Sequence, residues 1–190
     1  MPPTPPADGF PTDCALIEVH VSNLKQLFNS LDPTPFQERD LDPRAEEFII
    51  SWAHDVRSHM PLGLLVHVDR DEASGDADTM VHTAVRDHFG RRAQAMRQKL
   101  RQLFKLGRRS LLIGLMFLAT CIGLGDAIDA LAPASRLAGI VRESLLIGGW
   151  VAMWKPIEVF LYDWWPIRAE AVLSDRLSAM TVRVTSARGG

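Results

Sequence analysis

The sequence predicts a small cytoplasmic α/β (α+β) domain of about three strands, combined with a two-helix transmembrane hairpin. Two observations carry this prediction. Short apolar segments with strand character, Ala15–Val21, Leu62–Asp69 and Thr181–Thr185, alternate with segments of helical spacing. One strongly apolar stretch, Ser110–Trp154, is interrupted by a short polar turn and has charged, soluble-type sequence on both sides. The fold class therefore follows from these two patterns together.

The length, the composition and the net charge of the chain exclude few functions. The chain has 190 residues, 47% of them hydrophobic, and a formal net charge of −2. A charge so close to zero produces no global field that would attract nucleic acid. The two cysteines, Cys14 and Cys121, lie far apart in the sequence and suit a reducing compartment. Residues 1–14 are rich in proline and lack the basic and apolar regions of a signal peptide, so we expect a disordered tail there.

Residues 15–77 are expected to form the α/β domain, beginning with a strand. Apolar and polar residues alternate along Ala15–Val21, which is typical of a half-buried strand. Leu62–Asp69 is apolar almost throughout, which favours a central strand.

Two helices are expected between these strands. Ser22 is expected to cap a short helix over Asn23–Leu31. Asp42 followed by Pro43 predicts a helix start, because a capping side chain precedes a proline at the first helical position. The apolar spacing that follows predicts an amphipathic helix of about four turns.

Residues 78–109 are predicted to form a basic helical stalk. Apolar residues from Phe89 to Gly107 recur at alternating steps of three and four, which is a short heptad seam of the coiled-coil type. The seam fits packing on the chain's own domain or on a neighbouring helix. The same helix carries a basic collar that is expected to face anionic lipid headgroups: Arg91, Arg92, Arg97, Lys99, Arg101, Lys105, Arg108 and Arg109.

Residues 110–130 and 137–157 are predicted to be the two transmembrane helices. Ser110–Gly125 carries no charge, whereas the second arm is uncharged only over Ser144–Trp154. A full span needs about 20 apolar residues, so two alternatives stay open: a re-entrant or monotopic hairpin, and a buried hairpin of two core helices in a soluble protein. Because basic residues collect before the first arm, the positive-inside rule predicts a multi-pass membrane protein with both chain ends in the cytoplasm.

Residues 158–168 are predicted to be an interfacial aromatic segment, in which Tyr162, Trp164 and Trp165 anchor the chain at the headgroups. Residues 169–190 are predicted to form a helix and a third strand that return to the cytoplasmic domain. The hairpin would then be an insertion before the last strand.

Lys155, Glu158 and Asp163 are the catalytic candidates of this chain, because ionisable groups near a membrane are often functional. Counting from the turn near Pro133, however, Lys155 and Glu158 fall at the depth of the last arginines of the collar. An ion pair between Glu158 and Arg108 or Arg109 is therefore the structural alternative, and the sequence favours it.

The sequence indicates no metal site and no cofactor. His54 and His59 are five residues apart, and His82 and His88 are six apart, whereas two ligands on one helical face are four apart. The sequence contains no complete catalytic motif. Several small residues in the arms favour close helix approach, within the hairpin or between copies: Gly114, Ala119, Gly123, Gly125, Gly139, Gly148 and Gly149.

Two segments resemble a family of uncharacterised bacterial inner-membrane proteins. They are LFNSLDPTPFQERDLDPRAEEFI, Leu27–Ile49, and RESLLIGGWVAMWKPIEVFLYDWWPI, Arg142–Ile167. Together with the arginine-rich stalk, the resemblance covers most of the chain between Ile17 and Val184. It implies a location in the bacterial inner membrane and carries no activity.

The function expected from the sequence is that of a membrane-anchored cytoplasmic binding or scaffolding protein, and the sequence predicts no particular reaction. Its expected partners are a bilayer with anionic headgroups and either further copies of the chain or another membrane protein. One alternative is a membrane-surface enzyme or lipid-handling protein that uses Lys155, Glu158 and Asp163. A second is an oligomeric channel, since two helices alone cannot enclose a path. Nucleic acid is disfavoured as a partner because no stacking aromatics are interleaved with the basic collar.

Overall fold

The computed structural model describes residues 10–11, 13–28, 40–57, 60–69, 75–133 and 135–186. The chain divides into two compact units. One unit combines Met1–Ala95 with Glu170–Gly190, and the other is Met96–Ala169. We describe them in turn.

The first unit is built on a parallel three-stranded sheet. Its strands are β1 (Ala15–Val21), β2 (Leu62–Val68) and β3 (Thr181–Ser186), in the order β1-β2-β3. Ile17 pairs in register with Leu64, which pairs with Val182. The mixed α/β class is thereby confirmed, and the most apolar of the three strands occupies the centre, as expected for a strand that is covered on its sides.

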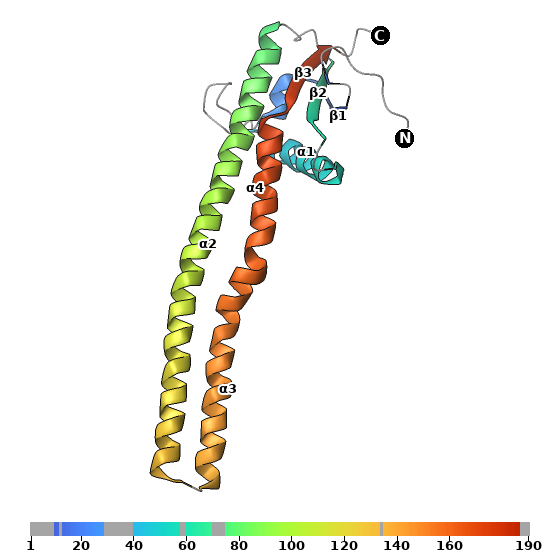
Figure 1. Ribbon diagram of the computed structural model, residues 1–190. Coiled ribbons are helices and arrows are strands. Elements are labelled where there is room, and N and C mark those ends of the chain that lie inside the picture. Colours follow the sequence, from blue (N-terminus) through green and yellow to red (C-terminus); the bar gives the residue numbers. More distant parts are fainter. Residues whose placement is uncertain are drawn as a thin grey trace. The chain divides into compact units, whose positions relative to one another are not determined.

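Helices pack on one face of this sheet (Figure 1). They are α1 (Pro43–Asp55), the beginning of α2 (Gly75–Leu131) and the end of α4 (Trp164–Ser178). Ile49 from α1, Phe89 from α2 and Leu177 from α4 are fully buried in one core with Ile17 and Val66 of the sheet. The C-terminal segment therefore belongs to the same core as the first strand, because Leu177 and Val182 complete it.

The start of α1 follows from local chemistry. Asp42 has extended backbone, and its side chain accepts a hydrogen bond of 2.9 Å from the backbone N–H of Arg44. Pro43 stands at the first helical position, where its missing N–H costs no intrahelical bond. The expected helix start is present at this site.

The short helix expected over Asn23–Leu31 differs in the structure. A 3-10 helix covers only Leu24–Leu27, and its cap is Asn23, whose side chain accepts from the N–H of Lys25 at 2.8 Å. Phe28 then forms an isolated bridge with Leu41, which ends the helix. The buried pair Leu24 and Leu27 has the three-residue spacing that suits a 3-10 turn. The rest of the expected helix lies outside the described residues.

The expected disordered tail over residues 1–14 can be compared with the structure only near its end, because residues 1–9 and 12 lie outside the described part. A Cβ atom added to Gly63 of β2 would meet the ring of Phe10 at 2.7 Å and the sulfur of Cys14 at 2.9 Å. Phe10 and Cys14 thus already pack against the sheet, at a position where only glycine leaves room.

A charged network connects α2 to α1 and to the residues just before it. His88 Nδ1 lies 3.2 Å from Asp40 Oδ1, and His88 Nε2 lies 3.3 Å from Glu46 Oε2. Arg91 donates to Asp40 Oδ1 at 2.6 Å, and Arg92 pairs with Glu46. Two residues that the sequence assigned to the membrane collar therefore bind acidic groups of the α/β unit.

The hydrogen bond from Arg91 holds the pKa of Asp40 below its usual range, with a further lowering from His88, while partial burial raises it. Because the folded-state pKa is below the unfolded value, this carboxylate stabilises the fold above the unfolded pKa and loses that effect as the pH falls through the folded pKa. An Asp40→Asn variant should be less stable than wild type at pH 7 by about 0.2–1 kcal/mol, the usual range for an exposed ion pair.

Denaturant unfolding at several pH values between 7 and 3 measures this prediction. The difference between wild type and Asp40→Asn should shrink at the acid end. Asp55→Asn, which changes an exposed carboxylate at the end of α1, is the matched control. A difference between wild type and Asp40→Asn that stays constant down to pH 3 would contradict the assignment.

Candidate functional site: an apolar helix pair with a basic collar

The second unit contains the longest apolar helices of the described chain. α2 continues without a break from the stalk into the first arm, and α3 covers Arg136–Glu158. By length and composition, Asp78–Leu131 and Arg136–Ser178, which contains α3, are each long and apolar enough to cross a membrane. The segments expected as stalk and first arm are parts of this one helix.

The two helices run antiparallel and contact each other through small residues (Figure 1). A Cβ atom added to Gly125 would meet Arg142 at 3.1 Å, and one added to Gly149 would meet Leu118 at 2.6 Å. Closer to the stalk, Gly114 faces Met153 and Gly107 faces Val159. Glycine at these positions allows the backbones to approach closely, as in membrane helix pairs.

Three other glycines of the arms point away from this contact. Cβ atoms added to Gly123, Gly139 and Gly148 would meet no atom within 4 Å among the described residues. The six glycines named by the sequence thus fall into two groups, one inside the helix pair and one on its outer surface.

Large apolar side chains remain exposed after the two helices have paired. In the most apolar stretch of each helix, only 17% of the residues are buried. The exposed side chains occur on both helices and include Ile113, Met116, Phe117, Leu137, Ile147, Trp150, Val151 and Trp154. A contiguous apolar surface of this kind is abnormal for a protein in water and is typical of a membrane or protein interface.

An ion pair lies near the turn between the helices. Arg142 Nε of α3 is 3.5 Å from Asp126 Oδ1 of α2. Arg142 is one of the two charges that the second arm has to tolerate if it begins near Leu137. Its pairing with Asp126 reduces the charge that the helix pair presents at this end.

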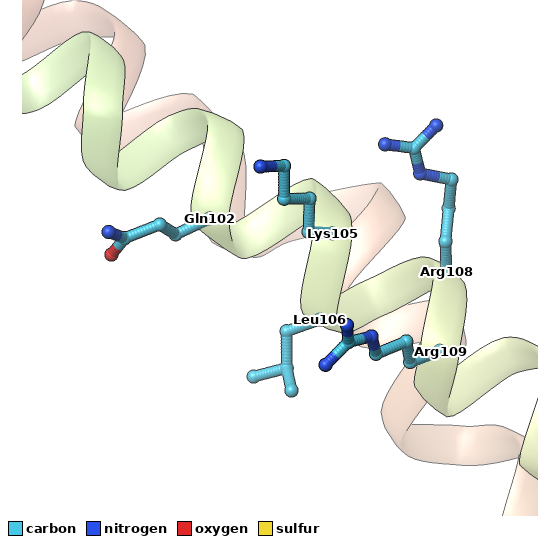
Figure 2. A pocket seen from close by; sticks show the side chains of 5 residues that line it. All are labelled: Gln102, Lys105, Leu106, Arg108 and Arg109. Atoms are coloured by element: carbon cyan, nitrogen blue, oxygen red, sulfur yellow. The ribbon is translucent and has the colours of Figure 1, made fainter.

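The basic residues of α2 border the apolar surface on the stalk side. Lys105, Arg108 and Arg109 are exposed and line an open hollow of about 440 Å³ together with Gln102 and Leu106. Figure 2 shows all five side chains projecting from α2. Ammonium and guanidinium groups next to an apolar surface match the chemistry of anionic lipid headgroups.

The catalytic candidates of the sequence lie together around a distortion of the helix. Lys155 Nζ is 3.0 Å from Glu158 Oε2 and 4.0 Å from Asp163 Oδ2. Pro156 is buried inside α3 and cannot donate a hydrogen bond. The π-helix η3 (Val159–Asp163) follows directly.

The ion pair expected between Glu158 and Arg108 or Arg109 is replaced by one with Lys155, three residues earlier on the same helix. The sequence placed Lys155 and Glu158 at the level of Arg108 and Arg109 along the helix pair, and this level fits Glu158 more closely than Lys155. Gly107 faces Val159, and Gly114 faces Met153, so Lys155 lies between these levels and deeper than Glu158. Both side chains of the pair are exposed, which fits a surface ion pair better than a reactive site.

The aromatic segment has both packed and exposed members. Tyr162 and Trp165 are exposed at 70% and 62%, as expected for side chains that reach a headgroup region. Trp164 is only half-buried, and its indole N–H donates to the carbonyl of Phe160 at 3.0 Å. Its ring centroid lies 6.5 Å from that of Phe104 on α2, so the ring of Trp164 lies against α2 and is only partly available as an anchor.

The sequence missed Arg168 as a member of the basic group. Its guanidinium carbon lies 5.6 Å from the ring centroid of Trp164, within the range of a cation–π contact. Both residues fall in the segment 158–168, where the sequence predicted no helix, so their spacing of four residues was not recognised as a contact on one helical face.

Comparisons with protein-family models, with curated proteins and with solved structures found no match. The resemblance of Leu27–Ile49 and Arg142–Ile167 to an inner-membrane family therefore stays a prediction.

The structure also forms two histidine clusters that spacing within one helix did not indicate. His88 joins Asp40 and Glu46, as described above. His20 and His67 stack on the sheet beside Glu18. The second cluster joins residues of two strands, so residue spacing within a single segment does not indicate it.

Proposed function

We propose that this chain is a membrane-anchored binding or scaffolding protein, with its α/β unit and both termini on the cytoplasmic side of a bacterial inner membrane. One observation carries the proposal: α2 and α3 pair with each other and still leave large apolar side chains exposed on both helices. Burial in lipid removes this surface from water at about 25 cal/mol per Å². In a soluble protein, a core helix would bury these apolar side chains inside the fold.

The orientation is supported by the distribution of charge. Arg97, Lys99, Arg101, Lys105, Arg108 and Arg109 precede the apolar part of α2, and Arg168 follows α3. The turn carries Asp126 and Asp129 with Arg136. The positive-inside rule therefore favours an exported turn and a cytoplasmic collar. Arg91 and Arg92 are left out of this collar because they bind Asp40 and Glu46.

The length of the uncharged region favours a thin or locally deformed span. Ser110–Gly125 covers about 24 Å at a rise of about 1.5 Å per residue, compared with a hydrocarbon thickness of about 30 Å. Arg109 and Lys155 can extend their chains toward the headgroups. At the end of the span next to the turn, the pairing of Asp126 with Arg142 lowers the free-energy cost of placing these two charges near the membrane.

The ion pairing and the exposure of Lys155, Glu158 and Asp163 favour a binding protein over an enzyme. The two carboxylates flank one ammonium group at 3.0 and 4.0 Å, and all three side chains retain substantial exposure. Such a group neutralises charge near the membrane surface. Assembly of several copies is supported by Gly123 and Gly139, whose Cα positions lie open on the outer surface of the helices.

Cysteine accessibility tests the topology. In a background where Cys14 and Cys121 are replaced by serine and alanine, single cysteines are placed at Asp129, Lys155 and Glu170. These positions are all exposed within their own units. A membrane-impermeant maleimide added outside the cytoplasmic membrane should label Asp129→Cys. Only inverted vesicles should allow labelling of Glu170→Cys.

Lys155→Cys reports on depth in the same experiment. We expect slower labelling than at Glu170→Cys and from the cytoplasmic side only, because Lys155 lies deeper than the collar. Labelling of Asp129→Cys from the cytoplasmic side would refute the proposed topology. Extraction of the wild-type protein from membranes by carbonate would refute the membrane span itself.

A further inference from the structure

The sheet of the α/β unit carries three metal-ligating side chains on the face that points away from the core. Glu18 and His20 are two residues apart on β1, and His67 of β2 is in register with His20. Side chains alternate between the two faces of a strand, and residues in register on neighbouring strands share a face. Ile17 and Val66, their neighbours in sequence, are fully buried on the opposite, helix-covered face.

The ligand atoms of these residues are already close. One nitrogen or oxygen from each lies within 4.8 Å of the other two. His67 Nε2 is 3.9 Å from Glu18 Oε2. The two imidazole rings are stacked, with centroids 4.3 Å apart and planes at 22°.

Small side-chain movements would bring these atoms to the spacing of a metal site. With metal–ligand bonds of about 2.0–2.1 Å, the ligand atoms of a tetrahedral zinc site lie about 3.3 Å apart. Shifts of about 1 Å at the side-chain tips reach that spacing, and rotation of one imidazole out of the stack points both ring nitrogens at the same ion. The backbones need not move, because β1 and β2 are held together along their whole length by the parallel ladder.

One of the three residues has an unsatisfied polar atom. Nε2 of His67 is buried and has no hydrogen-bond partner within the described part of the chain. The carboxylate of Glu18, at 3.9 Å, is beyond hydrogen-bonding distance. Buried polar atoms in proteins are nearly always satisfied, and an ion is one of the recognised explanations for an exception.

We propose that Glu18, His20 and His67 bind a divalent transition-metal ion, and that zinc is the ion this ligand set suits best. Two imidazoles select zinc over magnesium and calcium, which prefer oxygen ligands. Zinc has no geometric preference of its own and adapts to ligands supplied by two strands. The side chains of Glu18 and His67 are 41% and 22% exposed, so the ion can enter from solvent.

Three protein ligands leave one coordination position of a tetrahedral zinc ion open. That position takes a water molecule or a side chain from a binding partner. The proposed site is independent of the membrane assignment, since it lies entirely within the unit that contains the sheet.

Isothermal titration of the untagged, full-length protein in detergent with zinc chloride tests the proposal. After treatment with a chelator, wild type should bind one zinc ion per chain, and excess magnesium should not compete. His67→Ala should weaken zinc binding by more than the roughly 10–100-fold that loss of an outer-shell partner costs. Cobalt in place of zinc should give visible absorption bands of tetrahedral coordination, and these bands should vanish in the variant.

His54→Ala is the matched control, because it removes an exposed histidine of α1 that is not part of the cluster. It should bind zinc as wild type does. If His67→Ala does not fold, Glu18→Gln and His20→Asn decide the question, since both positions are exposed and circular dichroism verifies their folding. The proposal is overturned if wild type binds no zinc at micromolar concentration, or if folded variants at these positions bind it undiminished.

Discussion

Replacing Gly149 with leucine should disrupt the contact between α2 and α3. A Cβ atom at this position would lie 2.6 Å from Leu118 Cδ1 and 3.3 Å from its Cα atom. The backbone atom cannot move without moving the helix, so the two helices have to separate. Overpacking of this kind costs about 1–3 kcal/mol and occasionally more. Unfolding of the purified protein in detergent, followed by circular dichroism and tryptophan fluorescence, measures the loss.

Gly148→Leu is the matched control for this prediction. Gly148 is the neighbouring residue on the same helix, and a Cβ atom there would meet no described atom within 4 Å. Both variants gain the same intrinsic helix propensity, which is about 1 kcal/mol for replacing glycine. The difference between them therefore isolates the contact with Leu118. Equal stability of the two variants would show that α2 and α3 do not pack through this surface.

Replacing Phe89 with alanine should have the largest effect on the α/β unit. The side chain of Phe89 is fully buried between the sheet and the helices. Truncation of a buried phenylalanine costs about 3–5 kcal/mol, because transfer energy is lost and a cavity remains. Since domains have total stabilities of about 5–15 kcal/mol, the variant should be close to unfolding at 37 °C. Denaturant titration and susceptibility to limited proteolysis measure the change.

Phe48→Ala is the control for Phe89→Ala. Phe48 lies on α1 of the same unit and is 50% exposed. Its truncation leaves no closed cavity, so we expect a loss of less than about 1 kcal/mol. If Phe48→Ala were as damaging as Phe89→Ala, the outer side of α1 would be part of a buried interface.

The proposed membrane anchor and the proposed metal site can be tested independently of each other. Loss of zinc binding in folded variants would leave membrane association intact. Loss of membrane association in a variant of the hairpin would leave Glu18, His20 and His67 on an unchanged sheet, because all three belong to the unit that contains the sheet.

The strands and the apolar arms were predictable from the sequence. Ala15–Val21 and Leu62–Val68 carry local patterns that do not depend on the rest of the chain. Thr181–Ser186 could be recognised as the third strand for the same reason. The start of α1 was equally local, because Asp42 and Pro43 act on the backbone next to them.

The assignment of individual side chains was less predictable. The sequence placed Arg91 and Arg92 in the collar because they continue a basic run, but each binds an acidic group about fifty residues earlier in the chain. Trp164 has the composition of an interfacial anchor, yet it packs toward Phe104. A charge or an aromatic ring indicates the kind of partner, and the fold selects which partner is near.

The sequence by itself determined that a long apolar stretch is inserted before the last strand of a small α/β unit, because periodicity, hydropathy and capping are properties of neighbouring residues. Only the tertiary structure decided that the two arms pack through Gly114, Gly125 and Gly149. It alone brought His67 beside His20 and Glu18. The pairing of strands that are over forty residues apart is set by the shared core beneath them, and no local pattern encodes it.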